Sequence, residues 1–166
     1  MHVKNILLEL MIINLVKVAV KMSKKKKSEL DEFVEKLQEE IFDEERKTFS
    51  EKVIKEYHNP YKFGKMENPS ISGKYKGWCG DTLHLFLRIE KNKVIDASFF
   101  TDGCGATVAC GSMLIKLITD KEIEDLSKIT EEDLKEALDG LPLENEHCAT
   151  LAIKTLEETL KNYKKN

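Results

Sequence analysis

The most regular pattern of apolar and polar positions lies in residues 82–90. Every second residue is apolar there, which predicts a strand with one buried face; these residues are Leu83, Leu85, Leu87 and Ile89. The polar stretch Lys91–Lys93 then predicts a short turn, and residues 94–101 form a second strand-like run. Strands joined by a short turn pair as an antiparallel hairpin. The start of the first strand and the end of the second should therefore lie at the same end of the sheet.

A helical spacing of apolar residues governs most of the remaining chain. It predicts helices in residues 28–49, 50–58, 106–118 and 145–163, with shorter helical patterns in 123–138. Ser28 (with Asp31 in a capping box), Ser50 and Thr130 are the expected N-caps. The helix after Ser50 must end before Asn59–Pro60, because the residue before proline avoids helical geometry. Residues 59–77 hold most of the prolines and predict a loop or an edge strand.

The N-terminal region predicts no membrane span. Residues 6–20 are mostly apolar, but Glu9, Asn14 and Lys17 interrupt them, and the run falls short of the roughly 20 residues that a span needs. No small-residue cleavage site follows, so a signal peptide is not expected either. We interpret residues 1–21 as an extension without function or as an interfacial or partner-binding helix. Lys24–Lys27 fits a solvated linker, with weak attraction to anionic membranes as the alternative.

Composition narrows the class of protein. The chain has 166 residues, of which 41% are hydrophobic and 34% charged, as in a soluble globular domain with a core. A net charge of −3 gives no electrostatic case for nucleic acid. The four cysteines all lie between residues 79 and 148. Without a secretion signal, metal or redox chemistry in a reducing cytosol is favoured over a disulfide framework.

Three cysteines occupy positions that the predicted hairpin relates to one another. Cys104 lies at a strand-to-helix turn between two glycines, where the N–H groups of the helix start favour a thiolate. Cys79 precedes the first strand of the hairpin, so the two thiols should meet at one end of the sheet. The last helix could deliver His147 and Cys148 to that end, with Asp81 beside them. Such thiolates suit zinc or an iron–sulfur cluster, and a carboxylate or imidazole as fourth ligand should make the site releasable.

Each of these residues also has a purely structural interpretation. The three thiols could be inert and buried, Asp81 could open the strand as a turn residue, and His147 could orient its neighbours without touching metal. His58 and His84 fit structural or surface positions.

The motifs together resemble the IscU/NifU N-terminal family of iron–sulfur cluster assembly scaffolds. They are Cys79-Gly80-Asp81, the alternating strand, Phe99-x-Thr101-x-Gly103-Cys104-Gly105, and Leu141-Pro142 leading to His147-Cys148-Ala149, with Ser50-Glu51-Lys52-Val53 and Asn59-Pro60 upstream. The match covers roughly residues 50–163. The resemblance implies an α+β fold, with a small three-stranded antiparallel sheet packed against helices. Residues 1–49 have no counterpart in the family core, so the amphipathic pattern there predicts an extra N-terminal helix. We accordingly expect an extension and linker in residues 1–27, the extra helix in 28–49 and the scaffold domain in 50–166.

The resemblance also implies a function. The chain would assemble a transient [2Fe–2S] cluster and transfer it to apo iron–sulfur acceptor proteins, without being an enzyme. Its ligands would be Cys79, Asp81, Cys104 and Cys148, with His147 as an alternative or exchanging ligand, and zinc would bind at the same site. Sulfur would come from a pyridoxal-phosphate cysteine desulfurase, with Cys148 as the persulfide acceptor. A ferredoxin-type protein would supply electrons, and the location would be cytoplasmic.

Some residues depart from the family pattern. The segment Leu141–Asn145 reads Leu-Pro-Leu-Glu-Asn instead of Leu-Pro-Pro-Val-Lys, which argues against docking of an Hsp70-type chaperone. Trp78 stands where a small residue is usual, and we interpret it as a shield for the cluster. Cys110 replaces a usual serine and is expected to be a small buried hydrophobe. Two alternatives stay open: a zinc-dependent sulfurtransferase of the SufU type, whose usual insertion is absent here, and a zinc-stabilised structural module.

Overall fold

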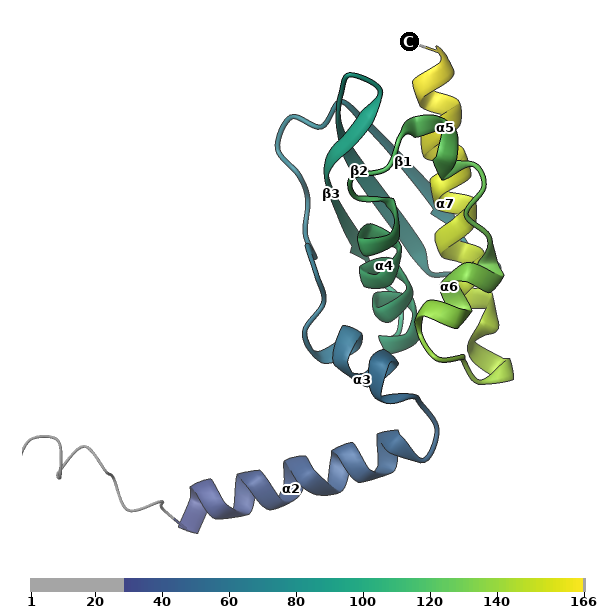
Figure 1. The fold of residues 1–166 in the computed structure, drawn as a ribbon. Helices are drawn as coiled ribbons and strands as arrows, with labels where there is room; N and C mark the ends of the chain where they lie inside the picture. The colour runs from purple at the N-terminus through teal and green to yellow at the C-terminus, as the bar shows by residue number, and fades with distance from the viewer. Residues whose placement is uncertain (1–28, 166) are drawn as a thin grey trace, which may run out of the picture. The chain divides into compact units, whose positions relative to one another are not determined.

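The computed structural model describes residues 29–165 (Figure 1). The chain divides into two compact units, residues 1–43 and residues 44–166. The elements are, in order, α2 (Glu29–Arg46), α3 (Glu51–His58), β1 (Ile71–Lys76), β2 (Thr82–Glu90), β3 (Lys93–Thr101), α4 (Gly105–Ile118), α5 (Ile123–Leu126), α6 (Glu131–Ala137), the 3-10 helix η1 (Leu143–Asn145) and α7 (Glu146–Lys165). The second unit holds the sheet and the helices from α3 onwards.

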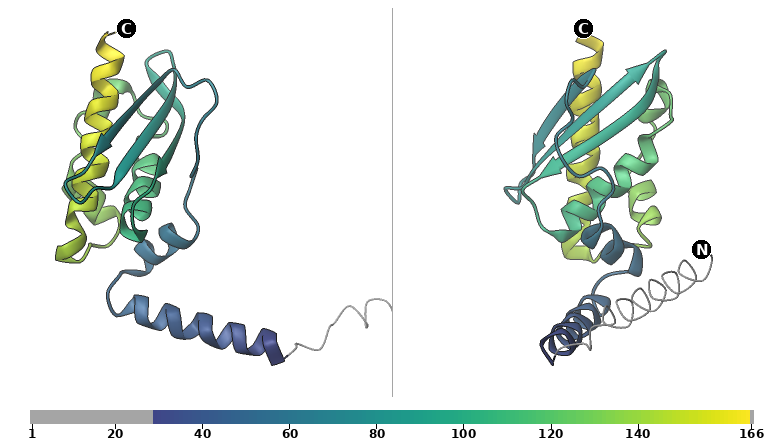
Figure 2. Two further views of the ribbon diagram at one scale, coloured as in Figure 1. Left: turned by 180° about the vertical axis from the view of Figure 1, so that it is seen from behind. Right: turned by 90° about the vertical axis from the view of Figure 1, so that its left-hand side faces the viewer.

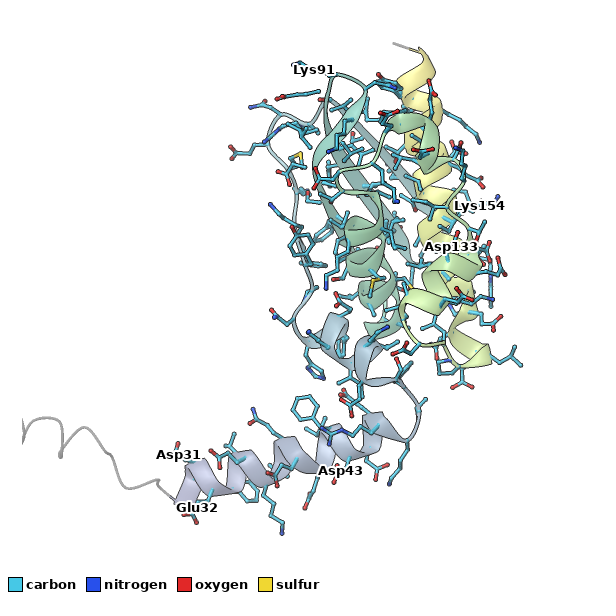
Figure 3. All side chains as sticks on the ribbon, in the orientation of Figure 1. Asp31, Glu32, Asp43, Lys91, Asp133 and Lys154 are labelled. Atoms are coloured by element: carbon cyan, nitrogen blue, oxygen red, sulfur yellow. The ribbon has the colours of Figure 1, made fainter. Side chains whose placement is uncertain are left out.

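The sheet has three antiparallel strands in the order β1-β2-β3, as predicted. The expected hairpin is present, and its two turn residues, Lys91 and Asn92, both have positive φ (48° and 64°), as a tight hairpin turn requires. Figure 3 labels Lys91 at the tip of this hairpin. At the opposite end Leu83 pairs with Thr101, so the start of β2 and the end of β3 lie side by side.

Two helices, α4 and α7, cover one face of the sheet (Figure 2). That face carries the alternating leucines of β2, and the predicted pattern is confirmed at three of four positions: Leu83, Leu85 and Leu87 are fully buried, whereas Ile89 is only partly buried. Phe99 of β3 is the largest fully buried side chain and belongs to the same core. The core thus joins the sheet to the two helices that bear Cys104 and Cys148 at their starts.

Predicted helix caps are confirmed where the structure describes them. Ser50 caps α3 by accepting a hydrogen bond from the Val53 N–H, and α3 ends at His58, just before Asn59–Pro60. Thr130 and Asp133 form a full capping box at the start of α6 (Asp133 is labelled in Figure 3). The expected loop or edge strand in residues 59–77 contains β1, which is an edge strand.

Helix α2 confirms the predicted amphipathic helix, although its expected cap, Ser28, lies outside the described residues. Five of its apolar side chains are exposed, with fractions between 41% for Leu37 and 68% for Leu30, whereas Phe42 is partly buried. None of the helices in residues 29–165 is long and apolar enough to cross a bilayer. The predictions for residues 1–21 and for Lys24–Lys27 concern residues that the structure does not describe.

Candidate functional site

The end of the sheet where β2 begins and β3 ends holds the chemically reactive side chains. Cys104 is the N-cap of α4 and follows β3 directly. Cys148 lies in the first turn of α7, and Cys79 lies in the loop of residues 77–81 between β1 and β2. Thus three elements that are separate in the sequence supply one thiol each, and the α4 helix start carries Cys104 as predicted.

Cys104 and Cys148 form a close pair of thiols. Their Sγ atoms are 4.0 Å apart, although 44 residues separate them in the chain. Two thiolates bound to one tetrahedral metal ion lie about 3.8 Å apart, given metal–sulfur bonds of about 2.3 Å. The pair therefore has nearly the spacing of two ligands of a single metal ion.

Asp81 reaches this pair from the loop before β2. Its Oδ2 accepts a hydrogen bond from the Thr107 hydroxyl (3.1 Å) and a longer one from the Cys104 N–H (3.4 Å). Thr107 is fully buried, and its Oγ1 also lies 3.3 Å from Sγ of Cys148 and 3.6 Å from Sγ of Cys104. Sequence reasoning missed Thr107, although its place three residues after Cys104, on the same face of the helix, was a usable signal.

Gly103 gives the Asp81 carboxylate its space. A Cβ at position 103 would lie 2.5 Å from Oδ2 of Asp81 and 2.8 Å from Cβ of Thr107, which is too close for any side chain. Gly103 and Gly105 are absent from the positive-φ glycines of the described chain, which are Gly64, Gly80 and Gly140. At position 103 the small size of glycine matters, and its wider range of backbone angles is not used.

The two thiols of the pair have opposite protonation preferences. The hydrogen bond from Cys148 is the main cause that lowers the pKa of Cys104 from 9.0 to about 5, and hydrogen bonds from the first N–H groups of α4 lower it further against the effect of burial. The same hydrogen bond, together with burial, raises the pKa of Cys148. At neutral pH the pair therefore consists of a Cys104 thiolate and a Cys148 thiol. The direction of the Cys104 pKa shift agrees with the thiolate expected at the helix start, but its main cause is a neighbour distant in sequence.

His147 and Trp78 lie at the edge of the pair. Nε2 of His147 is 3.7 Å from Sγ of Cys148, and the ring centroids of Trp78 and His147 are 5.0 Å apart. The Trp78 side chain is 84% exposed. In this structure the indole contacts the imidazole and leaves most of its own surface to solvent, so the interpretation of Trp78 as a shield stays a prediction.

Cys79 lies in an exposed loop; Cys104 is exposed as well, whereas Cys148 is buried. In residues 29–165 no three Cys, His, Asp or Glu side chains are drawn together closely enough to hold a metal ion. The structure thus pairs the sulfurs of Cys104 and Cys148 and places the Asp81 carboxylate against the Cys104 N–H and the Thr107 hydroxyl. His147 lies beside Cys148, and Cys79 stays on the loop that also carries Asp81. The donor types suit a thiolate-preferring metal or cluster, and a complete site requires movement of this loop or of its side chains.

Cys110, His58 and His84 lie in positions that fit the structural roles expected for them. Cys110 is fully buried in the core, and burial raises its pKa. Nε2 of His58 is 2.7 Å from a carboxylate oxygen of Glu45, and the ring of His84 lies against Phe86 and Phe100.

Comparison with known proteins identifies the same part of the chain. The family model described as "NifU-like N terminal domain" matches residues 48–166. The iron–sulfur cluster assembly scaffold protein IscU 1 of Archaeoglobus fulgidus is 35% identical over 116 residues, covering 69% of this chain and 76% of the relative. The scaffold protein IscU of Aquifex aeolicus is 32% identical over 118 residues, which cover 69% of this chain and 75% of that relative.

A solved structure shares the fold. It is the crystal structure of an iron–sulfur cluster assembly scaffold protein for the SUF system from Fervidobacterium islandicum. Its TM-score is 0.57, and its sequence is 22% identical to this one. The structural match covers 68% of this chain and 96% of that one. At this identity the likeness supports the α+β fold with a three-stranded antiparallel sheet.

Proposed function

We propose that this chain, which belongs to the NifU-like N-terminal domain family, is a scaffold that assembles iron–sulfur clusters and passes them to other proteins. Relatives that share about a third of their residues with it carry that description. The observation that carries the proposal is the pair of Cys104 and Cys148, 4.0 Å apart, with the Asp81 carboxylate held beside them. The chain acts in this proposal as a binding scaffold and not as an enzyme.

The cargo we propose is a transient [2Fe–2S] cluster. Cys104 and Cys148 supply two thiolates, and Cys79 supplies the third from its exposed loop. Asp81 is the proposed fourth ligand and His147 its alternative, since the imidazole already lies 3.7 Å from the Cys148 sulfur. A carboxylate is a hard ligand that exchanges on iron more readily than a thiolate. This mixed set suits cargo that must leave again, and zinc can bind to the same donors.

Sulfur would arrive as a persulfide on a cysteine desulfurase. The acceptor thiolate attacks the outer sulfur of that persulfide, the sulfur–sulfur bond breaks, and the desulfurase cysteine leaves as a thiolate. Cys148 is the proposed acceptor. Its thiol must first pass its proton to a base, and the Cys104 thiolate lies 4.0 Å away. The Cys148 side chain is also buried, so the Cys104 side chain or the 77–81 loop must move before it reacts. A pocket of about 260 Å³ beside Cys104, lined in part by Val53 and Tyr57, gives an incoming group access to this region.

Reduction and delivery need further partners. Each transferred sulfur must gain two electrons to become sulfide, and we propose a ferredoxin-type protein as their source. Apo iron–sulfur proteins would receive the finished cluster, with all partners in the cytoplasm. The segment Leu141–Asn145 ends in Leu-Glu-Asn, so an Hsp70-type chaperone is not part of the proposal.

Anaerobic reconstitution with iron and sulfide tests this function. We expect the wild-type chain to bind iron and sulfide in equal amounts, with the visible absorption of a [2Fe–2S] cluster, and to pass the cluster to an apo-ferredoxin. Cys104→Ser and Cys148→Ser should each lose the cluster. Cys110→Ala is the matched control, because it changes a cysteine of the same helix as Cys104 that is buried in the core.

Two outcomes would contradict the proposal. A wild-type chain that takes up zinc and accepts persulfide sulfur, yet never forms a cluster, would be a sulfurtransferase. A chain whose zinc stabilises it without any reaction with a desulfurase would be a structural module.

A further inference from the structure

We propose that Thr107 is a positioning residue, whose hydroxyl holds the Asp81 carboxylate against Cys104 and so sets how readily the site releases its cargo. The release step rests on the proposed scaffold function, whereas the positioning itself is a property of the chain without cargo. Thr107 touches Asp81, Cys104 and Cys148 at once.

The bond from Thr107 is the better of the two that hold the Asp81 oxygen. It spans 3.1 Å, whereas the bond from the Cys104 N–H to the same Oδ2 spans 3.4 Å, beyond the usual range for an N–H donor. Asp81 follows the exposed loop that carries Cys79. Without the Thr107 hydroxyl, only a weak bond would keep the carboxylate from turning toward water.

Thr107 has one hydroxyl proton, so it can donate a hydrogen bond to only one of its neighbours at a time. A threonine hydroxyl donates only one hydrogen bond, and an ionised carboxylate is a stronger acceptor than a neutral thiol. Of the two acceptors within reach, Asp81 Oδ2 at 3.1 Å and Cys148 Sγ at 3.3 Å, the proton therefore favours Asp81. The missing Cβ at Gly103, which would lie 2.5 Å from the same oxygen, leaves room for this arrangement.

The consequence concerns release of the cargo. Held beside Cys104, Asp81 competes with the thiolates as a hard and readily exchanged ligand and brings water to the edge of the site. A freed carboxylate would spend less time there, and the cargo would stay longer. Loss of the Thr107 hydroxyl should thus resemble a partial loss of Asp81.

The first test uses the apo protein and needs no cluster. The Cys104 amide signal in a proton–nitrogen correlation spectrum reports the Asp81 carboxylate that it contacts. Thr107→Val keeps the side-chain shape, and we expect it to move this signal in the same direction as Asp81→Ala does, whereas Thr107→Ser should leave it near the wild-type position. Thr155→Val is the control, because Thr155 is also fully buried but donates to the Leu151 carbonyl.

An unchanged Cys104 amide in Thr107→Val would overturn the positioning role. Should Thr107→Val fail to fold, Thr107→Ala also removes the hydroxyl and carries the same test.

The second test measures transfer of the cluster to an apo-ferredoxin. We expect Thr107→Val to slow transfer by roughly threefold to tenfold, the range of a hydrogen bond to a charged group that is only partly replaced. In the Asp81→Ala background the same change should add nothing, because Thr107 acts through Asp81. Equal slowing in both backgrounds would overturn the proposal. If the wild-type chain forms no cluster, the scaffold function fails while the apo test still decides the position of Asp81.

Discussion

Helix α4 carries two arrangements that look alike and differ in what surrounds them. Near its start the hydroxyl of Thr107 donates to Asp81, and at its middle the hydroxyl of Ser112 donates to Glu56 at 2.5 Å. The Glu56 carboxylate is 4% exposed and also pairs with the ammonium group of Lys116. The second arrangement is thus a neutralised ion pair that joins α3 to α4.

The arrangement around Asp81 has no such neutralisation in the described part of the chain. Asp81 accepts only from a hydroxyl and a backbone N–H there, and the Cys104 thiolate next to it adds a second negative charge. Two neighbouring anions without a cation favour a bound metal ion. In this helix the Ser112–Glu56 contact is structural because Lys116 neutralises it, whereas the Thr107–Asp81 contact leaves a negative charge that a bound cation can neutralise.

The largest expected effect on stability concerns the ion pair of Glu56 and Lys116. Lys116→Ala leaves the Glu56 carboxylate buried and unpaired, and should lower the free energy of unfolding by about 2–3 kcal/mol, less than for a fully buried pair because Lys116 is partly exposed. Urea unfolding measures this. Lys154→Ala is the control, since it removes an exposed pair with Glu157 and, because solvent screens such pairs, should lower the free energy of unfolding far less than Lys116→Ala does. Equal losses in the two variants would mean that the Glu56 pair is no more important than a surface pair.

The next effect concerns pH. The pKa of Cys104 is depressed, so its thiolate contributes stability that is complete above its ordinary pKa of 9.0 and disappears as the pH falls toward about 5. Alkylation of Cys104 by iodoacetamide, followed by mass spectrometry of its peptide, should therefore have a midpoint near pH 5. Cys148→Ala removes the main hydrogen bond and should raise that midpoint toward the ordinary value. A midpoint that stays the same would assign the low pKa to the helix start alone.

Asp81→Ala tests whether Asp81 acts as a cluster ligand or only stabilises the turn before β2. We expect slower cluster transfer with assembly retained, because the three thiolates remain and His147 is free to become the fourth ligand. If Asp81 were only a turn residue, the substitution would mainly cost stability, about 1 kcal/mol as for a lost cap. Transfer to apo-ferredoxin and thermal melts, recorded on the same preparations, distinguish the two. A variant that melts earlier but transfers at the wild-type rate would exclude the ligand role.

Removal of residues 1–21 should have the smallest effect on either arrangement. The family model begins at residue 48, and both arrangements lie beyond it. We expect unchanged thermal melting of the domain and unchanged cluster yield after reconstitution. A marked loss of solubility or of cluster yield would show that the removed segment supports the domain.

The sequence alone determined the elements whose causes are local. The alternating leucines of β2 and the turn at Lys91 and Asn92 act over a few residues, and so do the caps at Ser50 and Thr130, which is why the hairpin and the helix starts were predicted correctly. The motifs around Cys79, Cys104 and Cys148 identified the family for the same reason. Local pattern is enough to say that a thiol lies at the start of a helix.

Only the tertiary structure decided which groups act on one another. The low pKa of Cys104 depends mainly on Cys148, 44 residues away. Thr107 looked like an ordinary helix residue until the fold placed Asp81 against it, and Lys116 became a partner of Glu56 through packing of α3 on α4. Hydrogen bonds and charge interactions act over a few ångströms in space, so a sequence places the groups along the chain, and folding determines which of them meet.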